Sequence, residues 1–178
     1  LHDRPGFFRL CLRPEQLSEL NNPSFIGRRQ RHMNFVASTC MEFTPGSTNE
    51  CAGLVLLQNN NFHYRFVVTW APKKSKLIKL IRRRNGEETT LAEQIIEGDR
   101  VCLQVSAHEQ DYSFSYSNKP ENWQSIAKDV DGRVLSTPVA GGFIGAYIGL
   151  YASSNGKASE NVADFEWYLR MFKFGMPP

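Results

Sequence analysis

The stretch Phe62-His63-Tyr64-Arg65-Phe66-Val67-Val68-Thr69-Trp70 alternates between apolar and polar side chains, with one apolar exception at Val67. The even-numbered side chains are all apolar, and they share one face of a predicted strand because successive side chains of a strand point to opposite sides. The other face carries His63, Arg65 and Thr69. A strand with one apolar face covers a core on one side only, which is typical of antiparallel sheets.

The same two-residue period recurs later in the chain, in residues 101–108, 112–117 and 163–171. Turn-forming clusters separate the predicted strands, and the Asn85-Gly86 pair is a strong signal for a tight β-hairpin. Only residues 14–20 have helical character, over a single turn. Short strands at regular spacing predict an all-β fold, namely a two-layer antiparallel β-sandwich of about a dozen strands and of jelly-roll type.

Length and composition agree with one sandwich domain over residues 1–178. The chain has 41% hydrophobic and 22% charged residues, which is ordinary for a globular domain and argues against disorder or a coiled coil. No run of about 18 apolar residues occurs, so we expect no membrane partner. The first residue is not Met and no apolar signal segment follows, so the chain is expected to be a piece of a longer protein. The sequence does not fix the compartment, for which the bacterial cytoplasm or periplasm is the expectation.

Charge does not point to nucleic acid, because the net charge is only +3. Basic residues concentrate between Lys73 and Arg84, and we interpret this stretch as an edge strand or a hairpin that charge keeps soluble. A nucleic-acid surface is the alternative interpretation of the same residues.

The four cysteines lack the CxxC spacing of zinc sites and are too few for a disulfide scaffold. Cys40 and Cys51 flank an expected hairpin, which would allow them to approach each other. We nevertheless expect all four, Cys11, Cys40, Cys51 and Cys102, to be buried free thiols.

No catalytic motif is found in the chain. There is no GxSxG, no HExxH and no phosphate-binding glycine loop. We expect the four histidines, His2, His32, His63 and His108, to lie on the surface. Asp164 and Glu166 share one strand face, as a glycosidase acid pair would, but two acids on an outer sheet face are usually only solvated. No cofactor is expected, with a structural calcium ion at Asp164 as the alternative.

The segment Ala140–Tyr151 contains four glycines around one large aromatic residue, Phe143. The Gly141-Gly142 pair permits backbone conformations that other residues resist. Phe143 is therefore either a plug at the edge of the core or a projecting ring for a sugar or partner surface, since an aromatic face suits the C–H face of a sugar. Trp123, which follows a turn, is a second candidate for carbohydrate contact, with a core-capping role as the alternative.

Several short blocks, taken in order, resemble the C-terminal domain of glycoside hydrolase family 43 β-xylosidases. They are residues 5–10, 25–35, 41–43, 52–54, 62–64, 122–123, 142–149 and 163–165. A single block is weak evidence, but the ordered set is fairly specific and spans almost the whole chain.

This resemblance implies a concanavalin A-like sandwich that packs on a catalytic five-bladed propeller. In that family the propeller carries three catalytic carboxylates and releases xylose or arabinose from xylo- or arabino-oligosaccharides. A loop aromatic of the sandwich helps to close the pocket, and it matches Phe143, with Gly142 and Ile144 beside it. The family often has Thr where this chain has Ile144, and the catalytic acids have no counterpart in these residues.

We therefore weigh three hypotheses. The first is a non-catalytic accessory domain of such a glycosidase, with an apolar surface patch near Phe143 where the propeller would dock. The second is an independent carbohydrate-binding module, which needs a row of exposed aromatic side chains. The third is a protein-interaction or nucleic-acid domain that uses the basic stretch up to Arg84.

Overall fold

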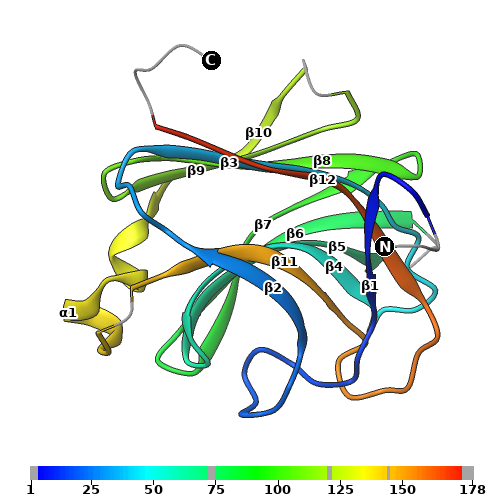
Figure 1. Cartoon of the computed structure of the whole chain (residues 1–178), viewed down its shortest axis with the longest axis horizontal. Coiled ribbons are helices and arrows are strands. Elements are labelled where there is room, and N and C mark those ends of the chain that lie inside the picture. The colour runs from blue at the N-terminus through cyan, green and yellow to red at the C-terminus, as the bar shows by residue number, and fades with distance from the viewer. Residues whose placement is uncertain (1–3, 72–74, 120–121, 144, 174–178) are drawn as a thin grey trace.

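The computed structural model describes residues 4–71, 75–119, 122–143 and 145–173, with side chains through Glu166. Within these residues, twelve strands form two six-stranded antiparallel sheets that face each other (Figure 1). This confirms the predicted β-sandwich and its number of strands. In the described part of the chain, no helix has the length and apolar character needed to cross a membrane.

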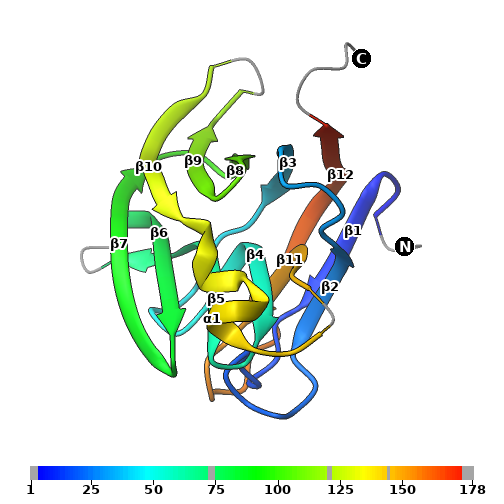
Figure 2. The same ribbon diagram turned by 90° about the vertical axis from the view of Figure 1, so that its left-hand side faces the viewer.

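Each sheet is assembled from strands that are distant in sequence. Sheet A has the order β1 (Phe7–Cys11), β12 (Val162–Lys173), β3 (Phe35–Glu42), β8 (Arg100–His108), β9 (Asp111–Ser117) and β10 (Gln124–Asp131). Sheet B has the order β2 (Ser24–Arg29), β11 (Tyr147–Ser153), β4 (Cys51–Asn59), β5 (Phe62–Ala71), β6 (Ser75–Arg84) and β7 (Glu87–Ile96). Two short helices, η1 (Gly132–Leu135) and α1 (Thr137–Ala140), lie at one end of the sandwich between β10 and β11 (Figure 2).

The core lies between the two sheets and consists of the alternating apolar faces that the sequence predicts. Tyr64 and Phe66 from β5 meet Phe114 from β9, with ring centroids 6.0 and 5.4 Å apart. All three side chains are fully buried. The ends of the β5 face, Phe62 and Trp70, are only half-buried.

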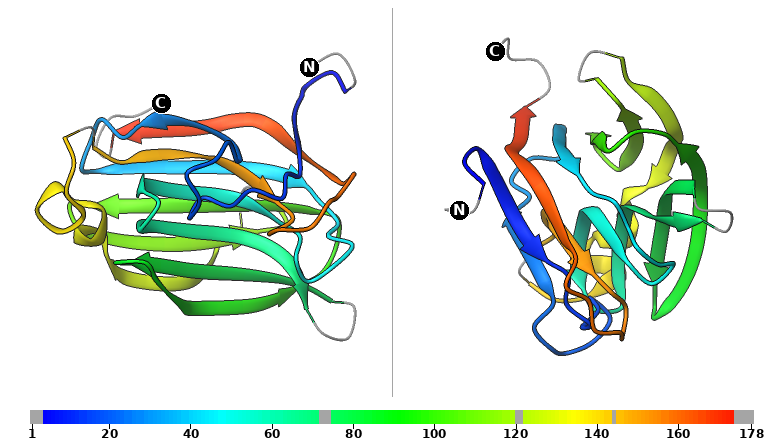
Figure 3. Two further views of the ribbon diagram at one scale, coloured as in Figure 1. Left: turned by 90° about the horizontal axis from the view of Figure 1, so that it is seen from below. Right: turned by 90° about the vertical axis from the view of Figure 1, so that its right-hand side faces the viewer.

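The outer face of sheet B is also buried at its central strands β4, β5 and β11, which corrects the expectation of one-sided strands. Leu17 packs there with Val55, Val67 and Tyr151 in a second apolar cluster. The segment between β1 and β2 crosses the outside of this sheet (Figure 3). That segment includes residues 14–20, where a turn closed by a hydrogen bond from Glu19 to Gln16 replaces the expected helical turn.

The Asn85-Gly86 turn joins β6 and β7 as predicted, with φ of 53° and 84° at its two residues. The basic stretch therefore forms one arm of a hairpin. The edge position belongs to β7, however, because β6 pairs with strands on both sides. Its basic side chains find acidic partners nearby, such as Glu88 for Arg83.

The free-thiol expectation is wrong for two of the cysteines. Cys40 in β3 and Cys102 in β8 are direct cross-strand partners and form a disulfide. They are 62 positions apart in sequence, so local spacing gave no signal of their contact. Cys51 is a buried free thiol as expected, whereas Cys11 is free but exposed.

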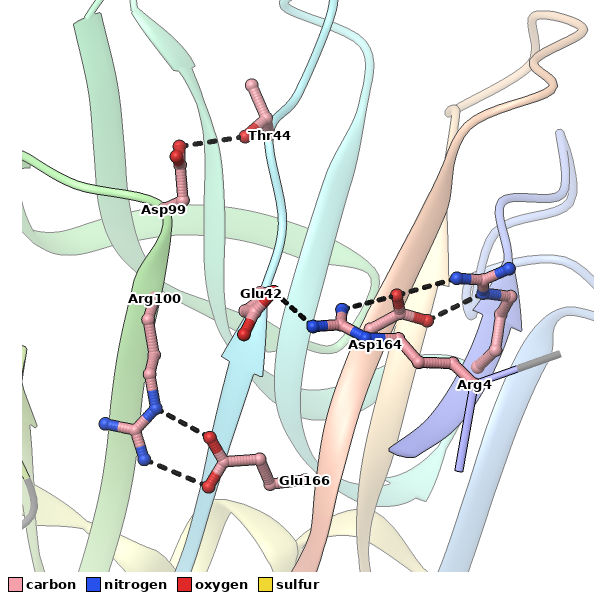
Figure 4. A network of polar contacts seen from close by, with 8 residues as sticks. Arg4, Glu42, Thr44, Asp99, Arg100, Asp164 and Glu166 are labelled. Carbon is pink, nitrogen blue, oxygen red and sulfur yellow. Dashed lines mark hydrogen bonds and ion pairs between the residues drawn. The ribbon is translucent and has the colours of Figure 1, made fainter. Parts of the chain in front are cut away.

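Within sheet A, a network of ion pairs links β1 and the residue Arg4 before it to β12 and β3 (Figure 4). Asp164 accepts hydrogen bonds from Arg9 at 2.7 and 2.8 Å and from Arg4 at 2.8 Å. Arg4 also pairs with Glu42 at 2.7 Å. These guanidinium groups, Arg9 first, hold the pKa of the Asp164 carboxyl below its usual range.

We expect Gly53→Ala to lower the free energy of unfolding by about 2 kcal/mol, because a Cβ at this position overpacks the sandwich. That atom would overlap the carbonyl oxygen of Phe66 and lie 2.8 Å from the Cα of Val67. Urea denaturation of the chain measures the loss. Gly46→Ala is the control, since its Cβ would lie 3.5 Å from the nearest atom, a Glu50 oxygen. Equal stability of the two variants would contradict this account of the packing.

Asp164→Asn should reduce stability at pH 7 by about 1–2 kcal/mol and flatten its dependence on acid pH. Because folding lowers the pKa of Asp164, its contribution is complete above the pKa of the unfolded chain, near 4. It is lost as the pH falls through the lower, folded-state value. Urea midpoints between pH 7 and pH 2 test this, with the exposed Asp111→Asn as the control. Parallel pH profiles for wild type and Asp164→Asn would refute it.

Candidate functional site

Phe143 projects from the loop between α1 and β11 into solvent. Its side chain has a relative exposure of 101%, so no other described residue covers the ring. The interpretation of Phe143 as a plug at the edge of the core is therefore wrong. The ring projects from the sandwich, and its service to a sugar or partner surface stays a prediction. A fully exposed phenylalanine is costly in water, which marks this loop as the first candidate for a contact surface.

The glycines around Phe143 determine how the loop leaves the sandwich. Gly141, Gly142 and Gly145 have φ of 73°, 79° and 72°, in the left-handed region that disfavours residues with a Cβ. Gly142 is exposed, as expected for a residue beside a projecting ring. Ile144 lies outside the described residues, so its predicted role stays a prediction.

Two side-chain amides from the end of β4 hold the start of the loop. Gln58 donates from Nε2 to the carbonyl oxygen of Gly141 at 3.0 Å. Asn59 donates from Nδ2 to the carbonyl oxygen of Ala140 at 3.1 Å. Sequence reasoning missed both residues. A glutamine directly after the apolar run of β4 was the available signal, because a polar residue at a buried strand end needs a partner.

A cavity of about 260 Å³ lies at the foot of the same loop. Gly145, Thr137 from α1, Met33 and Tyr112 are among the residues that line it. Met33 is 53% exposed and Val139 of α1 is 38% exposed. Two exposed apolar side chains and a hollow therefore lie at the same end of the sandwich as Phe143. The expectation that they form a docking patch stays a prediction.

His63, in β5, is buried, which corrects its predicted surface position. Its Nδ1 donates to the carbonyl oxygen of Asn59 at 3.3 Å, since a carbonyl can only accept. Burial, assisted by the nearby positive charge of Arg65, lowers the pKa of His63 to about 4. The ring is neutral at pH 7 and supports the β4–β5 turn rather than a reaction at the surface. The other histidines are His32 and His108, both exposed as predicted, and His2, which lies outside the described residues.

The structure does not bring Trp123 to the Phe143 loop. Trp123 precedes the first residue of β10, whereas the helices that lead to Phe143 follow the last residue of that strand. The two aromatics therefore lie toward opposite ends of the sandwich. Trp123 is half-buried, and its predicted contact with carbohydrate stays a prediction.

The two acids on β12 are engaged in ion pairs. Both oxygens of Asp164 accept from arginines, and Glu166 forms a two-pronged pair with Arg100 at 2.6 and 2.9 Å. Such pairing stabilises the ionised carboxylates and leaves neither suited to donate a proton. The suggestion of a calcium ion at Asp164 gains no support from these contacts, and no group of three potential metal ligands occurs among the described residues.

Comparison with known proteins agrees with the fold and with the ordered sequence blocks. Residues 1–169 match a family model described as the beta xylosidase C-terminal concanavalin A-like domain. A xylosidase/arabinosidase of Butyrivibrio fibrisolvens is 41% identical over 170 residues, which cover 94% of this chain and 32% of that protein. A protein of Bacteroides ovatus named non-reducing end alpha-L-arabinofuranosidase BoGH43B is 36% identical over 171 residues, which cover 94% and 31%.

A solved structure agrees as well. The structure named Bacteroides ovatus xyloglucan PUL GH43B superposes with a TM-score of 0.85 at 31% identity, and the match covers 92% of this chain and 32% of that one. The chain thus spans about a third of the length of these relatives. The family model, the sequence identity and the shared fold together show that the chain belongs to the family of C-terminal concanavalin A-like domains of beta-xylosidases.

Proposed function

We propose that this chain is a non-catalytic accessory domain that completes the substrate pocket of a glycoside hydrolase. The observation that carries the proposal is the full exposure of Phe143 on a loop whose base is tied to the sandwich. The acid residues that cleave the glycosidic bond would belong to a catalytic propeller domain, since the acids of β12 are already paired here. The relatives' names, xylosidase and arabinosidase, support a substrate ending in a pentose.

The Phe143 ring would contribute in two ways, by stacking on the substrate and by closing one end of the cleft. Its face can stack on the C–H face of a terminal sugar, which contributes of order 1 kcal/mol. The same ring would form a wall at one end of the cleft, so that the cleft accepts chain ends rather than the middle of a polysaccharide. Closure also removes water from the reacting bond.

Docking of the propeller would use the same end of the sandwich. Met33 and Val139 offer exposed apolar surface beside the loop, and the cavity at its foot offers a recess for side chains of the neighbouring domain. Burial of such surface is a common driving force for association. The propeller and a xylo- or arabino-oligosaccharide are thus the proposed partners.

An independent carbohydrate-binding module is the less favoured alternative. Such a module needs several exposed aromatic side chains in a row, and Phe143 is the only aromatic among the strongly exposed large hydrophobic residues of the described chain. One ring stacking on a sugar in open solvent gives weak affinity.

We expect calorimetry of the 178-residue chain with xylohexaose to give no saturable binding at ligand concentrations up to about 1 mM. A single exposed ring without a surrounding pocket provides too little contact. Saturable heat in this range would favour the independent module over the accessory role.

Phe143→Ala in the full-length protein should lower kcat/KM for xylobiose about threefold to tenfold, as expected for the loss of one stacking contact. The thermal midpoint should not change, because the ring contacts no core residue. Phe143→Trp, which keeps an aromatic face, is the control and should retain most activity. Unchanged kinetics in Phe143→Ala would remove the proposed role.

A further inference from the structure

We propose that Gln58 is a positioning residue for Phe143, and that its hydrogen bond to the loop comes at the expense of the stability of the domain. The inference rests on the proposed function of Phe143 and extends it to a residue that would not touch the substrate. If the inference holds, the selectivity for short substrates depends on the hydrogen bond that holds the loop as well as on the Phe143 ring.

The orientation of the Gln58 amide follows from its one partner. Gln58 is the next-to-last residue of β4 and is 5% exposed. The carbonyl oxygen of Gly141 can only accept a hydrogen bond, so the atom 3.0 Å from it must be the Nε2 donor. The other end of the amide, Oε1, is then fixed as well.

That other end has no partner. Oε1 of Gln58 is buried and accepts no hydrogen bond in the described structure. A buried acceptor without a donor destabilises a fold, because water would have satisfied it in the unfolded chain. An apolar side chain of the same size at this position, at the end of an apolar strand, would avoid that penalty. The presence of glutamine at position 58 is explained if the hydrogen bond from Nε2 to the loop serves the function of Phe143.

Gly141 does not need Gln58 for its own stability. Gly141 is an exposed residue, so we expect water to replace the amide at its carbonyl oxygen when Gln58 is substituted. The effect of the amide is directional: it fixes the carbonyl two residues before Phe143, at a point where Gly141 and Gly142 would otherwise permit many directions. Neither glycine has a side chain that would restrict the backbone. Gln58 is also close to the next residue, since a Cβ built at Gly142 would lie 3.5 Å from Nε2 of Gln58.

The neighbouring Asn59 differs from Gln58 because its side chain contacts both the loop and the β4–β5 turn. Its Nδ2 also holds the loop, at Ala140. However, its Oδ1 accepts from the backbone N–H groups of Asn61 and Phe62 at 2.9 and 3.1 Å, so it also builds the β4–β5 turn. Substitution of Asn59 would damage the turn together with the loop. The side chain of Gln58 has the loop as its one hydrogen-bond partner in the described structure, so its substitution separates the two effects.

The test uses Gln58→Met, Phe143→Ala and the double variant. Met matches the volume of Gln without polar atoms. We expect the thermal midpoint of the 178-residue chain with Gln58→Met to be equal to or higher than that of the wild type. In the full-length protein, Gln58→Met should lower kcat/KM for xylobiose at least threefold. The double variant should lose no more than Phe143→Ala alone, because Gln58 acts only through the ring.

Gln104→Met is the matched control, since Gln104 lies in β8 of sheet A, away from the loop. It should leave kcat/KM unchanged. Three results would overturn the positioning role: wild-type kinetics in Gln58→Met, a double variant whose losses multiply, or a clear fall in the thermal midpoint of Gln58→Met. If instead Phe143→Ala itself has wild-type kinetics, the proposed function fails first and the positioning role fails with it.

Discussion

The packing of sheet B against sheet A is the constraint on which the rest of the structure depends. Tyr64 and Phe66 of β5 interlock with Phe114 of β9, and Gly53 allows β4 to approach β5 without a side chain between them. Interiors packed at this density resist displacement. The end of β4 is therefore a rigid support, and whatever is attached there has a defined position relative to the whole sandwich.

The Phe143 loop is attached at that support. The side-chain amides of Gln58 and Asn59 donate hydrogen bonds to two consecutive carbonyl groups of the loop. Buried His63 in turn contacts the backbone carbonyl of Asn59. Gly141 and Gly142, both with positive φ, then lead to an aromatic ring that projects out of the domain. This division between a rigid base and an exposed tip is common where a scaffold presents a contact residue to another surface.

Much of the fold could be predicted because local alternation of apolar and polar side chains indicates antiparallel strands, as in residues 62–70. In addition, the backbone preference of Asn85-Gly86 indicates a hairpin. The errors concern contacts between distant segments. Burial of His63 depends on its place in the middle of sheet B, and the Cys40–Cys102 disulfide depends on the pairing of β3 with β8. Local patterns carry no information on such pairings.

The site was predictable to the same extent. Glycines on both sides of Phe143 indicated an unusual loop, but the residues alone left its ring either inside or outside the core. The amides that hold the loop lie more than 80 positions earlier in the chain, so only the folded structure connects them. The ion pairs of Asp164 could not be predicted either, because Arg4 is 160 positions away in the sequence.

The most direct test of the account is a crystal structure of the full-length protein with a bound xylo-oligosaccharide. The account predicts that the Phe143 ring enters the cleft of the catalytic domain and lies within about 4.5 Å of the terminal sugar. A structure in which the ring remains in solvent, or in which the sandwich docks through another face, would contradict it.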